Sequence, residues 1–203
     1  MKKLALAALA LSTLTGSAFA AKGFNASFWA PDKQIVPASE DINGVRLNIY
    51  GENRNVNGVD IGLGNSVTGN MSGAQLCVFL PCIYNNVGGQ LNGAQFGIVN
   101  EYGIKVNGAQ FGWVNYSRAE SSEVNGAQFS IVNWCSQTEV TGAQLGFVNK
   151  AKTVTGVQLG FVNLTDKLKG VQLGLWNMVL ERSWGDIGNK GLGRGFPFIN
   201  VGW

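Results

Sequence analysis

The chain has 203 residues, 45% of them hydrophobic, with 29 glycines, 15 basic and 12 acidic residues and no histidine. The length suits one domain, and the missing histidine removes the commonest general base and metal ligand. The small net charge of +3, without a basic run, argues against a nucleic-acid partner.

Residues 1–20 carry the pattern of a secretory signal peptide. Lys2 and Lys3 precede an apolar run, and Ala18-Phe19-Ala20 matches the small-residue cleavage site. Without this segment the chain has 13 basic and 12 acidic residues, a net charge of +1. The segment predicts export to the periplasm, outer membrane or surface of a Gram-negative bacterium.

Residues 21–41 lack the pattern of the rest of the chain. A strand is predicted from Phe24 to Trp29, followed by a loop with Pro31 and Pro37. We interpret the segment as an N-terminal strand and cap, because a stack of repeats needs an atypical unit over its first open edge.

Residues 42–177 consist of nine copies of one phrase, clearest in GAQLGFVN, GVQLGFVN and GVQLGLWN, with 14 to 20 residues from one opening glycine to the next. Short-period repetition of this kind indicates a repeat architecture. We number each copy from its opening glycine as position 0. These glycines are Gly44, Gly58, Gly73, Gly93, Gly108, Gly126, Gly142, Gly156 and Gly170.

The columns formed by equivalent positions predict strands with two faces. Position 1 is Ala or Val in every copy, and positions 3 and 5 are apolar in every copy, as Leu159 and Phe161 illustrate. Because strand side chains alternate between faces, positions 1, 3 and 5 share one face, which we expect to be buried. Lys152, in a connector, is expected to be exposed.

Two all-β architectures fit these strands. A parallel β-solenoid of about nine coils of 14–20 residues stacks identical positions roughly 4.8 Å apart, so that equal amides form hydrogen-bonded ladders. We favour it because it explains why the same polar residue recurs at one position. The alternative is an up-and-down antiparallel β-barrel of outer-membrane type, which alternating short and long connectors would suit.

The solenoid predicts two ladders and one ion pair. The ladder residues at positions 2 and 7 are Gln75, Gln95, Gln110, Gln128, Gln144, Gln158, Gln172, Asn100, Asn115, Asn133, Asn149, Asn163 and Asn177. Asn65 also occupies position 7, whereas Gly51 and Leu80 interrupt that column. Arg46 and Asp60, the charged residues at position 2, have opposite signs in neighbouring copies and form a candidate salt bridge.

Residues 178–203 end the repeats. Met178 to Lys190 is irregular, Gly191 to Gly195 suggests a turn, and GFPFINVGW suggests a last strand. Pro197 lacks a backbone donor, so the strand is expected at an edge or a bulge. The segment is a C-terminal cap in a solenoid or the closing strand in a barrel.

The three cysteines are an odd number for an exported chain. Cys82 and Cys135 share position 9 but lie three copies apart, too far for a disulfide in a stack. Cys77 and Cys82 can pair if Pro81 turns the chain sharply. We otherwise expect buried or free thiols.

No catalytic, cofactor-binding or metal-binding residues are assigned, and no cofactor is expected, because the acidic residues are scattered singly through connectors. The best binding candidates are Trp113 and Trp134 with Tyr116 and Tyr102, although Trp113 occupies position 5 and is expected to pack in the core. The interruptions at 80–92 and 116–123 are interpreted as surface excursions.

The GVQLGxxN phrase, the signal peptide and the closing FPFINVGW resemble a family of bacterial surface-repeat proteins from Gram-negative envelopes. The resemblance implies an envelope location and no known activity. We therefore expect a non-enzymatic, exported structural or interaction scaffold. The alternatives are a small outer-membrane barrel that forms a pore, and a secreted adhesin or effector. The partner is unknown; the outer membrane and another envelope protein are candidates.

Overall fold

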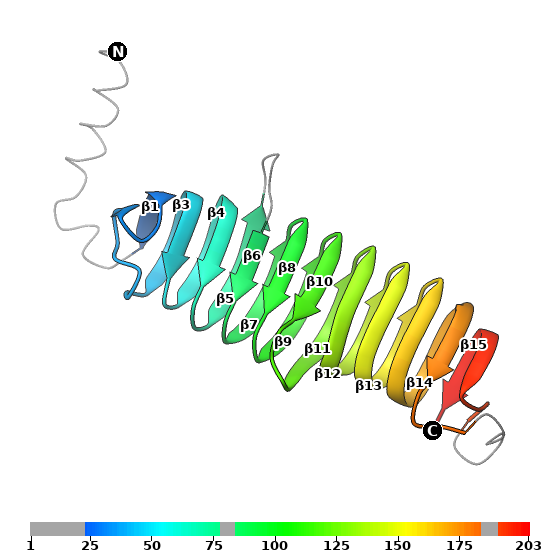
Figure 1. The fold of residues 1–203 in the computed structure, drawn as a ribbon. Coiled ribbons are helices and arrows are strands. Elements are labelled where there is room, and N and C mark those ends of the chain that lie inside the picture. The colour runs from blue at the N-terminus through cyan, green and yellow to red at the C-terminus, as the bar shows by residue number, and fades with distance from the viewer. Residues whose placement is uncertain (1–22, 78–83, 184–190) are drawn as a thin grey trace.

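The computed structural model describes residues 23–77, 84–183 and 191–203. These residues form one elongated stack of coils that runs from β1 at one end to β15 at the other (Figure 1). The strands are β1 Phe24–Trp29, β2 Lys33–Gln34, β3 Ile42–Asn53, β4 Val56–Val67, β5 Met71–Cys77, β6 Tyr84–Val87, β7 Gln90–Phe96, β8 Val99–Tyr102, β9 Lys105–Phe111, β10 Val114–Ser117, β11 Ser122–Phe129, β12 Val132–Leu145, β13 Val148–Leu159, β14 Val162–Val179 and β15 Gly195–Gly202.

Neighbouring repeats pair in parallel and in register, so the protein is an all-β solenoid of about 8 turns, as the repeat pattern predicted. Gly142 of β12 pairs with Gly156 of β13, which in turn pairs with Gly170 of β14. An up-and-down barrel requires antiparallel neighbours. The barrel alternative is therefore wrong, and the closing-strand interpretation of residues 178–203 is lost with it.

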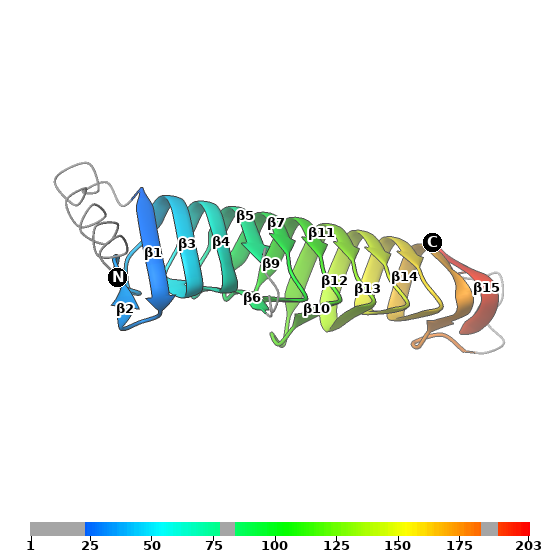
Figure 2. The same ribbon diagram turned by 90° about the horizontal axis from the view of Figure 1, so that it is seen from above.

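Each coil has two layers joined by a bend. Positions −2 to 3 form one layer, which includes β5, β7 and β9, and positions 6 to 9 form the other, which includes β8 and β10 (Figures 1 and 2). β6 pairs with β8 in this second layer, although residues 78–83 place it later in its copy. From β12 onward a single long strand contributes to both layers. The interior of the solenoid is the narrow space between the layers.

The interior is filled by four columns of equivalent residues. Position 9 is largely apolar, with Val67, Tyr102, Cys135, Ala151 and Val179 buried. Position −2 is apolar throughout, and all nine members are buried. They are Ile42, Val56, Met71, Leu91, Val106, Val124, Val140, Val154 and Leu168. Position 2 is buried in every copy, as is the Asn at position 7, so the interior is half amide and half hydrocarbon.

The predicted burial of positions 1, 3 and 5 is wrong. Leu159 is 45% exposed, Phe161 is 49% exposed and Trp113 is 62% exposed. Position 2 shares its face of the strand with position −2, so burying Val154 also buries Gln158 and turns Leu159 outward. Lys152 is exposed, as expected.

The glycine at position 0 is required by the close stacking of coils. Gly156 has a φ of +137°, a region that L side chains avoid. A Cβ added to it would lie 2.0 Å from the carbonyl oxygen of Gly142 in the preceding coil. The same holds along the column, so any larger residue at position 0 would push two coils apart.

The two ends differ from the repeats. The strand predicted from Phe24 to Trp29 is β1, which pairs in parallel with β3 and in antiparallel with β2. The strand predicted near the C-terminus is β15, which contains Pro197 and pairs in antiparallel with β14. Each end of the stack is thus covered by a strand outside the repeat phrase.

The interpretation of residues 80–92 as a surface excursion is wrong for residues 84–92, because β6 and the start of β7 belong to the stack and Asn85, Val87 and Leu91 are buried. Residues 80–83 lie outside the described residues, as does the signal segment 1–20. Residues 116–123 include the end of β10 and the start of β11, and Ser122 is buried.

Candidate interaction surface

The glutamines at position 2 form one continuous ladder. From Gln172 back to Gln95, each side-chain Nε2 donates to the Oε1 of the glutamine in the preceding coil at 2.6–2.9 Å, and Gln75 accepts the last of these bonds. Every donor points toward the N-terminal end, so the amide dipoles align and their positive end lies beside the second coil. Buried amides are stable here because their neighbours satisfy them.

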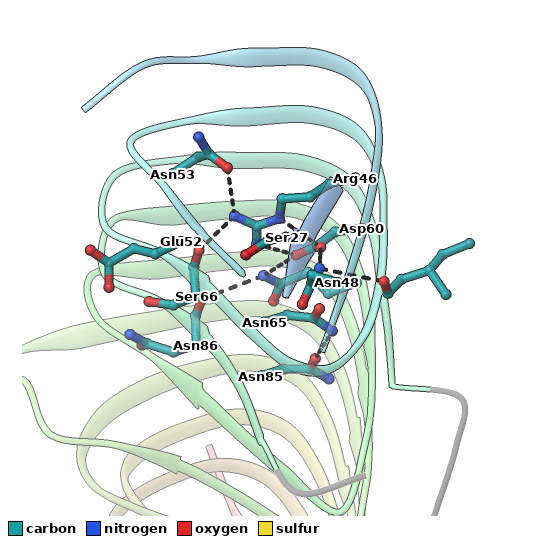
Figure 3. A network of polar contacts seen from close by, with 12 residues as sticks. Ser27, Arg46, Asn48, Glu52, Asn53, Asp60, Asn65, Ser66, Asn85 and Asn86 are labelled. Atoms are coloured by element: carbon teal, nitrogen blue, oxygen red, sulfur yellow. Dashed lines mark hydrogen bonds and ion pairs between the residues drawn. The ribbon is translucent and has the colours of Figure 1, made fainter. Parts of the chain in front are cut away.

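The Asp60 carboxylate accepts the last hydrogen bond of this ladder, and the Arg46 guanidinium neutralises its charge. Figure 3 shows Arg46 beside Asp60. The Nε2 of Gln75 donates to Asp60 Oδ2 at 3.2 Å. Arg46 donates from Nε to Oδ1 at 2.8 Å and from Nη2 to Oδ2 at 2.5 Å, and both side chains are fully buried. Its Nη1 donates to Asn53 Oδ1 and to the Ser66 carbonyl. The structure thus brings together the two residues of the candidate salt bridge.

The asparagines at position 7 form a second ladder with the opposite polarity. From Asn65 to Asn177, each Nδ2 donates to the Oδ1 of the asparagine in the following coil at 2.8–3.0 Å. Asn177 at its end donates to the carbonyls of Gly174 and Phe196. The two rows of amide dipoles run in opposite directions through the interior and oppose each other.

Sequence reasoning missed one member of this ladder, Asn85, because residues 78–83 shift it away from position 7. Asn85 accepts from Asn65 and donates to Asn100. A signal was available: Asn65, Asn85 and Asn100 each lie eight residues before the next opening glycine. Counting backwards as well as forwards would have found it.

The outer face of the first layer carries a continuous apolar surface, here called the apolar stripe. None of its described members is buried. It consists of Val45, Val59, Ala74, Ala94, Ala109, Ala127, Ala143, Val157 and Val171 at position 1, Leu47, Ile61, Leu76, Phe96, Phe111, Phe129, Leu145, Leu159 and Leu173 at position 3, and Ile49, Leu63, Ile98, Trp113, Ile131, Phe147, Phe161 and Leu175 at position 5.

The stripe is ordered by the same stacking that orders the interior. The ring of Phe111 stacks on those of Phe96 and Phe129, with centroids 4.7 and 4.9 Å apart. Phe147 stacks on Phe161 at 4.5 Å. The rings form ridges along the long axis of the solenoid, so the surface is already in a fixed shape before anything covers it.

An apolar groove of about 590 Å³ runs along the C-terminal part of the stripe. Its walls are Leu145, Leu159 and Leu173 on one side and Phe147, Phe161 and Leu175 on the other. Phe198 of β15 closes its end and is 70% exposed, with a φ of +66°. A bulky residue is uncommon in this left-handed region, and here that backbone conformation accompanies an aromatic ring placed at the end of the groove.

The end strands continue the stripe although they lack the repeat phrase. In β1, Phe24 and Ala26 align with Val45 and Leu47 of the first copy. In β15, which runs in the opposite direction, Val201 and Ile199 align with Val171 and Leu173 of the ninth copy. Repetition of one phrase does not explain this continuity, which points to a requirement on the surface itself.

The border of the stripe at position −1 is polar and nearly uncharged. Position −1 carries Asn, Ser or Thr in eight copies and Lys169 in the ninth. Asn107 donates to Asn92 at 2.8 Å and Asn125 donates to Asn107 at 3.2 Å, so part of this border is itself an exposed ladder. No charged residue occupies positions 1, 3 or 5 in any copy.

The outer face of the second layer is different, and it holds two of the aromatic candidates, Tyr116 and Trp134. The hydroxyls of Tyr84 and Tyr116 both donate to Glu101 Oε2, and Arg118 lies 3.3 Å from Glu101 Oε1. Burial and the bond to Glu101 raise the pKa of both tyrosines. These side chains form their hydrogen bonds and ion pair with one another.

The four aromatic binding candidates lie apart. Trp134 is 47% exposed on the second layer with the Lys150 ammonium 4.7 Å from its ring centroid, whereas Trp113 projects from the stripe. Tyr116 belongs to the Glu101 group, and Tyr102 is fully buried, donating to Cys135 Sγ at 3.2 Å. The structure therefore does not bring them together into one site.

The cysteines differ in state. Cys77 is disulfide-bonded, while Cys135 is free and buried. Cys82, the partner that the sequence allows for Cys77, lies outside the described residues. Burial raises the pKa of the Cys135 thiol, so it is protonated at neutral pH.

Comparison of the chain with family models, curated proteins and solved structures finds no match. Within the described ranges, no group of three His, Cys, Asp or Glu side chains is placed to hold a metal ion. The described residues also form no helix that is long and apolar enough to cross a membrane. The apolar stripe is the candidate functional surface.

Proposed function

We propose that this protein is a non-enzymatic, exported scaffold of the bacterial cell envelope that acts through its apolar stripe. The observation that carries the proposal is the continuity of the stripe through β1, the described members of all nine copies and β15. Monomeric soluble proteins rarely expose contiguous apolar patches above a few hundred Å², and larger ones mark interaction sites.

The free energy of the stripe supports an interaction role. Burial of apolar surface contributes about 25 cal/mol per Å². Leu159 and Phe161 are about half exposed, as are Ile131, Phe147 and Leu175, while the other described members of these columns are partly exposed, so the isolated chain leaves part of this energy unrealised. A partner that covers the stripe would gain it, while the ladders hold the scaffold rigid.

Two features support export. The signal pattern of residues 1–20 includes the cleavage site at Ala18 to Ala20. Cys77 is disulfide-bonded, which fits an oxidising compartment such as the periplasm or the cell surface. The resemblance to envelope surface-repeat proteins agrees with this location.

The chemistry of the side chains supports a non-enzymatic role. The chain has no histidine. Its buried charged pair, Arg46 and Asp60, terminates a structural ladder, and Glu101 is held by two tyrosines and an arginine. These groups act within the scaffold and none faces a pocket beside a second acid or base.

The experiment compares one tryptophan on each face. Trp113→Ser removes the most exposed side chain of the described position 5 residues, and Trp134→Ser makes the same change on the second layer. Each variant is expressed in a Gram-negative host, and the envelope fraction is resolved by native electrophoresis. We expect Trp113→Ser to lose the wild-type assemblies and Trp134→Ser to keep them; assemblies unchanged in both would refute the proposed function.

A further inference from the structure

We propose that the partner of the apolar stripe is the stripe of a second copy of this chain, running in the opposite direction. The inference rests on the proposed function and names its partner. In the resulting two-fold symmetric dimer the fifth copy, which contains Trp113, meets itself, and the first copy meets the ninth.

The order of residue types at positions 1 and 3 of the stripe is symmetric about the fifth copy, whereas position 5 is symmetric only for the copies next to it. Position 1 reads Val, Val, five alanines, Val, Val, and position 3 reads Leu, Ile, Leu, three phenylalanines, Leu, Leu, Leu. The centre of both columns is the fifth copy, with Ala109 and Phe111. At position 5, Ile98 and Ile131 flank Trp113 symmetrically.

An antiparallel dimer explains this symmetry. In an isologous two-fold interface each surface meets its own reverse, so residue classes must match from the centre outwards. Here the three phenylalanines at position 3 meet one another, and the Leu and Val residues of positions 1 and 3 at one end meet those at the other. Stacking within one chain imposes no such symmetry, because each coil there contacts only its neighbours.

The area suffices for a stable dimer. From β1 to β15 the stripe covers ten coil spacings of about 4.8 Å, and positions 1 to 5 cover about 13 Å, which gives roughly 620 Å² as a flat surface. Two copies would bury roughly 1,250 Å², within the range of specific interfaces that begins near 1,200 Å². Ridges such as the Phe111 ring stack add to this value.

The chemistry of the stripe favours a copy over other occupants. A peptide would bring backbone donors and acceptors, and the outward side chains at positions 1, 3 and 5 offer only the indole N–H of Trp113 in return. A bilayer surface is commonly held by flanking Lys and Arg, whereas the border at position −1 contains Lys169 as its one cation. A second stripe is equally apolar and uncharged.

The first test measures the assembly of the purified full chain by analytical ultracentrifugation at micromolar concentration. We expect a dimer for the wild type and for Trp134→Ser. Trp113→Ser removes a central aromatic side chain from both copies, and we expect the dissociation constant to rise about 30-fold or more. A β-sheet circular dichroism spectrum shows that each variant folds.

The second test fixes the direction. Leu47→Lys and Leu173→Glu lie on the first and ninth copies, and each alone weakens the homodimer. Mixing these two variants brings the opposite charges together only in the antiparallel dimer, so a heterodimer forms. The matched control mixes Leu47→Lys with Leu47→Glu, which lie at opposite ends of an antiparallel dimer and do not rescue each other.

The outcomes separate the two proposals. A wild-type chain that is monomeric, or one that binds neutral phosphatidylcholine vesicles instead of itself, overturns the dimer; so does rescue by the Leu47→Lys and Leu47→Glu mixture. If Trp113→Ser still abolishes assemblies in the envelope while the purified wild type is monomeric, the dimer fails and the interaction scaffold survives. If Trp113→Ser changes neither readout, both fail.

Discussion

Within one coil, two neighbouring residues show how the inside of this solenoid differs from the outside. Gln158 is completely buried, whereas Leu159, the next residue, is 45% exposed. Inside, each amide between the ends of a ladder is satisfied by an identical amide in the coils before and after it. Outside, the described apolar side chains at positions 1, 3 and 5 contact their neighbours in the stack but stay partly exposed to solvent. In this fold, a polar side chain can be buried when stacking supplies its hydrogen bonds, so hydrophobicity alone does not decide which residues lie inside.

The contrast between the interior and the outer face also indicates what each contributes: stability of the stack inside and association outside. Exposing a leucine instead of burying it forgoes about 1.5–3 kcal/mol, and the chain does so in copy after copy. The ladders and the apolar column at position −2 must supply the stability of the isolated stack. The stripe is free to contribute to association.

The largest expected effect is at the charged end of the glutamine ladder. Arg46→Ala leaves the fully buried Asp60 carboxylate without its counter-ion, and Asp60→Ala leaves the Arg46 guanidinium without its own. Breaking a buried pair in this way costs about 3–5 kcal/mol. We expect each variant to lose that much in the free energy of unfolding measured with urea.

The control extends the ladder instead of breaking it. In the double variant Arg46→Gln and Asp60→Gln, the side chain at 60 can accept from Gln75 and donate to the side chain at 46. We expect it to be more stable than either single alanine variant. A double variant as unstable as the sum of the two would contradict the role of Asp60 as a ladder cap.

The next effect compares a leucine inside the solenoid with a leucine on its outer face. Leu91 at position −2 is fully buried, and Leu159 at position 3 is half exposed. Leu91→Ala should cost about 2–5 kcal/mol because it opens a cavity. Leu159→Ala should cost less than about 1 kcal/mol in the monomer. Equal losses in urea unfolding would mean that the stripe is part of the core.

The leucine comparison marks where sequence reasoning succeeded and where it failed. Repetition of one amide at one position predicted parallel stacking, because stacked coils alone bring equal positions together. The same logic placed Gln158 in a ladder, yet the core was assigned to Leu159 on hydrophobicity. Val154, four residues before Gln158, shares its face, so the apolar column at position −2 already contradicted that assignment.

Other features could not be read from one repeat. The opposite polarity of the two ladders depends on how the amides are oriented in space, which no residue letter encodes. The membership of Asn85 was hidden by an insertion. The cap strand β15 was predicted as a strand, but its direction, and hence the alignment of Ile199 with Leu173, came only from the structure.

A smaller effect compares the middle of the glutamine ladder with its end. Gln128→Leu leaves the Nε2 of Gln144 and the Oε1 of Gln110 without their ladder partners. Gln172→Leu removes a donor from Gln158 Oε1 and from the Met178 carbonyl but leaves no donor without its acceptor, since Gln172 Oε1 has no hydrogen-bond partner among the described residues. We expect a loss of about 1–3 kcal/mol for Gln128→Leu and a smaller one for Gln172→Leu. Thermal unfolding of the two variants side by side measures the difference.

The smallest effect concerns the one titratable thiol of the described interior. Burial raises the pKa of Cys135 above that of the unfolded chain, which is about 8.5. Above pH 8.5 the unfolded thiol ionises while the folded one stays protonated, so the stability from this group is fully present below that pH and declines as the pH rises. The slope approaches about 1.4 kcal/mol per pH unit.

Between pH 8.5 and 10, below the ordinary tyrosine pKa, the wild type should lose about 1 kcal/mol more in urea unfolding than Cys135→Ala does. Since this comparison concerns slopes, a constant loss from the alanine cavity does not affect it, and equal slopes in both chains would show that Cys135 is open to solvent.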